Sequence, residues 1–214
     1  MSDIEQWVET WRDLGVGDSP TLRRLYDDVR ARYAEPHRHY HTHQHLAECF
    51  EKVEEIIVLA QHPAEVKVGL WFHDAIYDTR RHDNEARSAE WARSAAHDLG
   101  ARAASAERID DLIMFTRHAA EPVGRDAQVL VDVDLSILGA EAERFREYEM
   151  QVRREYSWVP EDTFRIGRAK ILKDFLDRAH IYSTTPFRER YEIPARRNLR
   201  HSLEQLGAAE VDDP

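Results

Sequence analysis

Apolar residues recur every three or four positions in nearly every segment of this chain, which has 214 residues. This spacing places them on one face of an α-helix, whereas a half-buried strand would alternate apolar and polar residues. The chain also has only eight glycines and few runs of the β-branched residues that favour strands. The sequence therefore predicts an all-α fold, organised as a single-domain helical bundle over residues 1–214.

Capping residues predict several helix boundaries. Ser19 precedes Pro20, which is the arrangement of an N-cap followed by proline at the first helical position. The other predicted boundaries are N-caps at Asp3, Asp83 and Ser105 and helix ends at Pro36 and Gly100.

The segment 129–139 is ambiguous, because its alternation suits a strand while the flanking helices favour a buried helix. Three further helices are predicted at 141–156, 161–180 and 186–206. The tail after Gly207 is expected to be frayed.

Composition and charge exclude several classes of partner. The formal net charge of −11 argues against nucleic acid, because phosphate binding needs a basic surface. No apolar run approaches the roughly 18 residues of a membrane helix, and no signal peptide precedes the first helix. The single cysteine, Cys49, excludes intramolecular disulfides and is expected to be a buried, inert thiol. Together these features predict a cytoplasmic protein.

A histidine-rich stretch leads into one of the predicted helices. Five of the twelve histidines lie between residues 37 and 45. We expect His41 and His45 to share one face of this helix, because they are four positions apart. Neutral imidazole is the commonest protein ligand for metal ions. The alternative is a solvated loop that binds no specific ion.

A histidine followed by an aspartate occurs three times. The pairs at His82 and His97 lie at a loop and at a helix end, where both side chains can be solvated. The third pair, His73 and Asp74, follows the apolar residues 70–72. Two buried ionisable groups are costly unless they pair with each other or bind a metal.

Asp134 is also expected to be a buried ionisable group, because its sequence neighbours Val131, Val133 and Leu135 are apolar. A carboxylate in such a segment needs a strong partner. The candidates are a metal ion, an N-cap position and a buried arginine. The neighbouring Asp132 is open to the same alternatives.

These residues resemble the metal ligands of the HD superfamily of metal-dependent phosphohydrolases. The set has one histidine on a first helix, an adjacent His-Asp pair on the next and a distant aspartate. In this sequence its members are His45, His73, Asp74 and Asp134.

Two short motifs extend the resemblance. Residues 40–45 are similar to the Tyr-His-Asn-x-x-His motif of cyclic-nucleotide phosphodiesterases, with Thr42 in place of the asparagine. Residues 134–136 are similar to the Asp-Leu-Ser around the last ligand of those enzymes. The chain most resembles a small bacterial group of predicted HD phosphohydrolases, over roughly residues 20–200.

The resemblance implies an HD-type helical fold and a metal-dependent phosphohydrolase that acts on a small phosphorylated metabolite, with a nucleotide as the expected substrate. Imidazole and carboxylate ligands suit Mn, Co, Fe, Ni or Zn, and Mg is also compatible. Relatives build a two-metal site from further histidines, and His118 and Glu85 stand near where these would be. We expect one tightly held ion, and the alternative is a second ion that is held more weakly.

The remaining roles follow from position and charge. We expect His41 to protonate the leaving oxygen, because it lies one helical turn before His45. Asp78 or Glu85 is expected to orient the attacking water. Arg38 is the nearest cation for a phosphate and His118 a second substrate-binding candidate. For Arg38, Asp78 and Glu85 a solvated surface charge is the alternative.

Two other functions stay open. One is a metal-dependent oxygenase, because related HD folds carry di-iron sites. The other is a metal- or nucleotide-binding sensor without turnover. The complete set of four ligand residues argues against such a sensor.

Overall fold

The computed structural model describes residues 3–207. Within this range the chain forms ten α-helices and three short 3₁₀-helices, without a strand. This confirms the predicted all-α fold. The chain divides into two compact units, Met1–Asp134 and Leu135–Pro214, which we describe separately. That the whole chain is one domain stays a prediction, and the predicted frayed tail lies outside the described residues.

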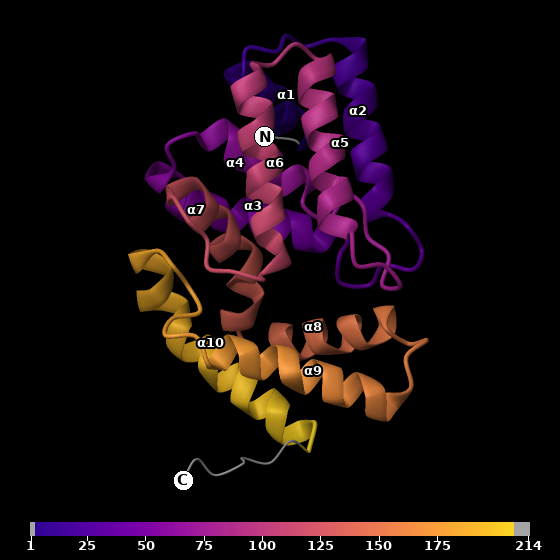
Figure 1. The fold of residues 1–214 in the computed structure, drawn as a ribbon, viewed down its shortest axis with the longest axis vertical. Coiled ribbons are helices and arrows are strands. Elements are labelled where there is room, and N and C mark those ends of the chain that lie inside the picture. Colours follow the sequence, from indigo (N-terminus) through magenta and orange to yellow (C-terminus); the bar gives the residue numbers. More distant parts are fainter. Residues whose placement is uncertain (1–2, 208–214) are drawn as a thin grey trace. The chain divides into compact units, whose positions relative to one another are not determined.

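The first unit contains seven α-helices and two 3₁₀-helices among its described residues (Figure 1). Their bounds are α1 Asp3–Asp13, α2 Pro20–Tyr33, α3 His43–Ile56, η1 Ile57–Leu59, α4 Pro63–Phe72, α5 Asn84–Asp98, α6 Ala103–Met114, η2 Phe115–Arg117 and α7 Arg125–Asp134.

Helix α4 is the centre of this unit. It packs against α1, α3, α5, α6 and α7, and most of its side chains are buried. A helix that is apolar on all sides is stable only when other elements surround it. Trp71 and Phe72 at its C-terminal end contact Trp7 of α1, with ring centroids 5.3 and 6.0 Å apart. The residues that follow α4 are thereby held at a fixed place in the core.

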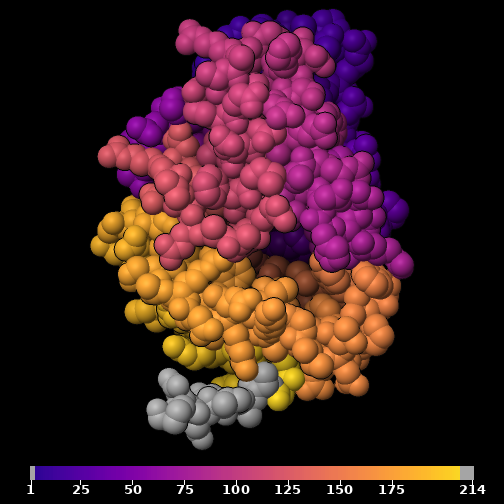
Figure 2. Space-filling model, in the orientation of Figure 1, coloured from indigo at the N-terminus to yellow at the C-terminus, as the bar shows by residue number. Residues whose placement is uncertain are grey.

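Helices α5 and α6 form an antiparallel pair, which the space-filling view shows as a continuous magenta surface (Figure 2). The chain turns between them at Gly100, whose φ of +82° favours glycine. This confirms the predicted helix end. An ion pair between Glu65 of α4 and Arg108, at 2.5 and 2.6 Å, joins α6 to the central helix.

The predicted caps are partly confirmed. The hydroxyl of Ser19 accepts a hydrogen bond from the backbone N–H of Leu22 at 3.1 Å. Asp83 is the N-cap residue of α5, as predicted, but its side chain makes no capping bond, because its carboxylate pairs with Arg81 at 2.6 and 2.7 Å. Ser105 is wrong as a cap, because α6 already begins at Ala103.

The second unit contains η3 Leu135–Gly139, α8 Ala142–Glu155, α9 Glu161–Leu176 and α10 Thr185–Gln205. The three long helices agree closely with the predicted segments. The ambiguous segment 129–139 is helical, because it forms the end of α7 and all of η3. The amide of Asn198 on α10 donates to the carbonyls of Leu138 and Ala140 at 2.9 and 2.8 Å, which fixes η3 on that helix.

Gly139 allows η3 to approach α10 closely. A Cβ there would lie 2.7 Å from the Cβ of Tyr191 and 2.9 Å from its carbonyl oxygen. We expect Gly139→Ala to lower the free energy of unfolding by about 1–3 kcal/mol, the usual cost of overpacking. Gly167→Ala on α9 is the control, since its Cβ would meet nothing within 4 Å, and it should raise stability by about 0.5–1 kcal/mol. Urea unfolding measures both, and equal shifts would contradict the argument.

No helix in residues 3–207 has both the length and the apolar character that crossing a membrane requires.

Candidate metal centre

The His-Asp pair lies at the C-terminal end of α4, where the chain leaves the core. His73 is the C-cap residue of this helix and is buried. Its Nδ1 donates to the carbonyl of Leu70 at 2.8 Å. This bond leaves Nε2 free to act as a ligand, because metal-binding histidines commonly donate the other ring nitrogen to a carbonyl or carboxylate.

His45 meets His73 from the first turn of α3. Its ring is also buried, and the two Nε2 atoms lie 3.0 Å apart. Helix α3 begins at His43 because Thr42 caps it, with the hydroxyl accepting from the N–H of Gln44 at 3.3 Å. Threonine and asparagine are both N-cap residues, so Thr42 performs the capping that asparagine would perform there.

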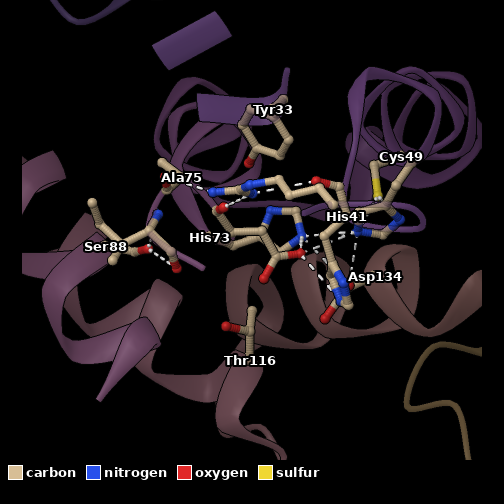
Figure 3. Close-up of polar contacts among 12 residues, drawn as sticks. Tyr33, His41, Cys49, His73, Ala75, Ser88, Thr116 and Asp134 are labelled. Atoms are coloured by element: carbon tan, nitrogen blue, oxygen red, sulfur yellow. Dashed lines mark hydrogen bonds and ion pairs between the residues drawn. The ribbon is translucent and has the colours of Figure 1, made fainter. Parts of the chain in front are cut away.

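Two carboxylates complete the cluster. Asp74 Oδ2 lies 3.0 Å from His73 Nε2 and 3.5 Å from His45 Nε2. Asp134, the last residue of α7, places Oδ1 3.5 Å from each of the same nitrogens. Figure 3 shows His73 and Asp134 approaching each other from separate helices. The side chains of Asp74 and Asp134 remain 17% and 13% exposed, so the carboxylate side of the cluster is open to solvent.

These separations fit the coordination sphere of one metal ion. With bonds of about 2.1 Å, neighbouring ligand atoms lie about 3.0 Å apart in octahedral and about 3.4 Å apart in tetrahedral geometry. Five donor pairs among His45, His73, Asp74 and Asp134 lie between 3.0 and 3.5 Å apart. This group of buried or half-buried side chains could therefore hold a metal ion.

Cys49 is a further candidate donor, since its sulfur lies within 4.8 Å of donor atoms of His45, His73 and Asp134. Its Sγ is 3.7 Å from both ring nitrogens of His45. A sulfur equidistant from the two nitrogens lies beside the imidazole and not beyond Nε2, where an ion would bind. We therefore favour Asp74 over Cys49 as the fourth ligand.

Without an ion, the four groups stabilise one another as charged pairs. Burial alone would lower the pKa of His73, but the charge of Asp74 outweighs it and holds that pKa well above the usual value. Burial of His45 is likewise outweighed by Cys49, Tyr40 and the two carboxylates, which raise its pKa.

Both carboxylates show the opposite shift. Burial would raise the pKa of Asp74, but the charges of His73 and His41 hold it well below the usual value. Burial acts on Asp134 in the same way, and its hydrogen bond with His118 is the largest of the effects that lower its pKa.

Metal uptake should therefore depend on pH. An ion binds the neutral imidazole, whereas the raised pKa values keep His45 and His73 protonated to higher pH. We expect affinity to rise as the pH is raised through and above the ordinary range of histidine, and about two protons to be released per ion where both imidazoles are protonated. Calorimetry in buffers of different ionisation enthalpy measures this release. An affinity that does not change with pH would contradict the assignment of the two histidines.

His41 does not lie on α3, and the predicted shared helix face with His45 is wrong. The Thr42 cap places His41 in the preceding loop. His41 nevertheless reaches the cluster, with Nε2 4.0 Å from Asp74 Oδ2 and a side chain that is 19% exposed. Its ring stacks on Tyr77, with centroids 4.0 Å apart and planes at 28°. It is therefore next to the candidate ligands at the solvent-exposed side.

His118 lies beside Asp134. Its Nε2 is 3.1 Å from Asp134 Oδ2, and the side chain is 23% exposed. Among residues 3–207 it is the only non-glycine residue with positive φ, at 53°. Side chains of L-amino acids avoid this conformation, and such strain often marks functional sites. His118 therefore lies next to the candidate metal ligands, as predicted. Its role in substrate binding stays a prediction.

Arg38 differs from the expectation of a phosphate-binding side chain. It is fully buried and donates to backbone carbonyls of the loop after α4. Because its donors are directed at the protein, this geometry weighs against phosphate binding.

Asp78 and Glu85 are half-buried, and no described contact joins either of them to the four candidate ligands. The Oδ1 of Asp78 accepts from the N–H of Arg80 at 2.9 Å and so belongs to a turn. Their roles in orienting water stay predictions. His82 and His97, from the other two His-Asp pairs, are exposed, as expected.

Comparison with known proteins does not assign the chain to a family. No protein-family model matches the chain, and neither does a curated protein or a solved structure. The resemblance to HD phosphohydrolases therefore depends on the residues and motifs given above.

Proposed function

We propose that this chain is an HD-type, metal-dependent phosphohydrolase that acts on a small phosphorylated metabolite, with nucleotides as the expected class. One observation carries the proposal. Two buried imidazoles and two carboxylates that are only slightly exposed place their donor atoms 3.0–3.5 Å apart at the C-terminal end of the central helix.

The ligand types favour a divalent transition metal. His45, His73, Asp74 and Asp134 would supply two nitrogen and two oxygen ligands, which suit Mn²⁺, Fe²⁺, Co²⁺, Ni²⁺ or Zn²⁺. Such an ion, when bound, lowers the pKa of water and stabilises negative charge on phosphoryl oxygens. Four protein ligands leave coordination positions for substrate in a six-coordinate site.

The chain's own residues have distinct tasks. Partly exposed and 4.0 Å from Asp74, His41 would donate a proton to the leaving oxygen. His118 would hold Asp134 in its orientation through the 3.1 Å contact with Oδ2. Such contacts to a ligand fix its position and tune its basicity.

Metal analysis of the purified protein, followed by an activity screen, tests the proposal. The screen uses phosphomonoesters and phosphodiesters, nucleotides included, with Mn²⁺, Co²⁺ or Mg²⁺. We expect turnover in the wild type and in His97→Ala, and none in Asp74→Ala.

Two results would contradict the proposal. Tightly bound iron with an absorption band, without hydrolysis, would indicate the oxygenase. Bound metal without turnover of any ester would indicate a sensor.

A further inference from the structure

Arg38 belongs to the histidine-rich loop before α3, where a charged side chain would be expected to face solvent, but it is buried. None of its side chain is exposed. Its guanidinium lies against the rings of Tyr33 and Tyr77, 5.3 and 5.5 Å from their centroids. Burying a cation is costly unless hydrogen bonds compensate it, so its partners determine what it does.

Those partners join two segments far apart in sequence. On its own loop, Nε donates to the carboxylate of Glu35 at 3.1 Å and Nη1 to the carbonyl of His41 at 3.3 Å. Beyond α4, Nη1 donates to the carbonyl of Asp74 at 2.6 Å and Nη2 to that of Ala75 at 3.0 Å. Basic side chains commonly bind carbonyls that a helix end leaves without partners.

The same guanidinium thus holds a candidate metal ligand and the candidate proton donor. It binds the backbone of Asp74 and of His41 directly, and it packs on Tyr77, the residue on which the His41 ring stacks. His37 adds a second link, with Nε2 2.9 Å from the Tyr77 carbonyl.

We propose that Arg38 is a positioning residue that sets the His41 ring relative to Asp74, so that proton donation and metal binding occur in one geometry. Its role in catalysis rests on the proposed function, whereas its role in placing the ring does not. Lysine cannot replace it, because a single ammonium lacks the planar fork that reaches acceptors on both segments.

Proton NMR tests the placement without any substrate or metal. In the wild type the ring protons of His41 should be shifted upfield by the Tyr77 ring, and His41→Asn identifies their signals. In Arg38→Ala the shift should disappear, and millimolar guanidinium, which fits the vacated space, should restore it. Arg38→Lys provides a second variant that keeps the charge and most of the side-chain volume and should also lose the shift.

Arg32→Ala is the matched control. Arg32 also binds Glu35, at 3.0 Å, but it is half-exposed and has no described bond to residues 74–75. It should keep the upfield shift and the activity. An unchanged shift in a folded Arg38→Ala or Arg38→Lys, or an equal loss in Arg32→Ala, would overturn the proposal.

Activity then separates the two proposals. If the protein hydrolyses phosphate esters, Arg38→Ala should retain metal and lose at least about tenfold in kcat on an ester with a poor leaving group, and at most the roughly 10²–10⁴-fold that removal of a general acid typically costs. Guanidinium should restore part of this rate. If the wild type hydrolyses no ester, the proposed function fails, while the NMR result still decides whether Arg38 places His41.

Discussion

Asp74→Ala should abolish retention of the metal ion. The substitution removes one of four donors and leaves the two buried imidazoles without the carboxylate that lies 3.0 Å from one and 3.5 Å from the other. Loss of a residue that merely supports a ligand costs about 10–100-fold in metal affinity, so loss of the ligand itself should cost more than about 100-fold. Metal content after dialysis, and competition with a chelator, measure the effect.

His97→Ala and His82→Ala are the matched controls, since both residues belong to His-Asp pairs and both are exposed. They should retain wild-type metal content. Circular dichroism checks whether Asp74→Ala is folded. Equal loss in all three variants would mean that the wrong pair was chosen, or that unfolding explains the result.

His41→Ala should lose turnover while it keeps its metal. His41 is 4.0 Å from Asp74 but is not among the four donors with separations of 3.0–3.5 Å. Removing a general acid typically costs about 10²–10⁴-fold in rate. We expect this loss on an ester with a poor leaving group and a far smaller one on an aryl phosphate, whose leaving group hardly needs the proton. Steady-state kinetics on the two esters measure the difference.

Two outcomes would change the role of His41. Release of the metal from His41→Ala would make it a ligand. Normal turnover of both esters with bound metal would make it only a polar residue beside the site.

The helices could be predicted because periodicity and turn residues are local signals. Gly100 and Ser19 act where the sequence predicts, since each works through its own backbone or that of a near neighbour. Asp83 is the N-cap residue of α5, as the sequence predicts, but it makes no capping bond because Arg81 competes for its carboxylate. The segment 129–139 could not be decided from sequence, since the contacts that hold η3, such as those from Asn198, come from residues about 60 positions away.

The candidate site was predicted in part for the same reason. Buried ionisable residues such as His73 and Asp134 are conspicuous among apolar neighbours, and they do converge. The position of His41 was misjudged because the helix begins after Thr42. Arg38 was misjudged because its loop resembles a solvated surface, and only the carbonyls 36 and 37 positions away reveal that it is buried.

The central claim, one ion held by His45, His73, Asp74 and Asp134, can be tested directly in crystals soaked with Mn²⁺ or Co²⁺. Anomalous difference density, recorded above the metal's absorption edge, locates the ion. We predict one strong peak within about 2.0–2.3 Å of the two Nε2 atoms and of an oxygen from each carboxylate. A peak bonded to the sulfur of Cys49 in place of Asp74, a peak elsewhere, or no peak at full soaking concentration would contradict the claim.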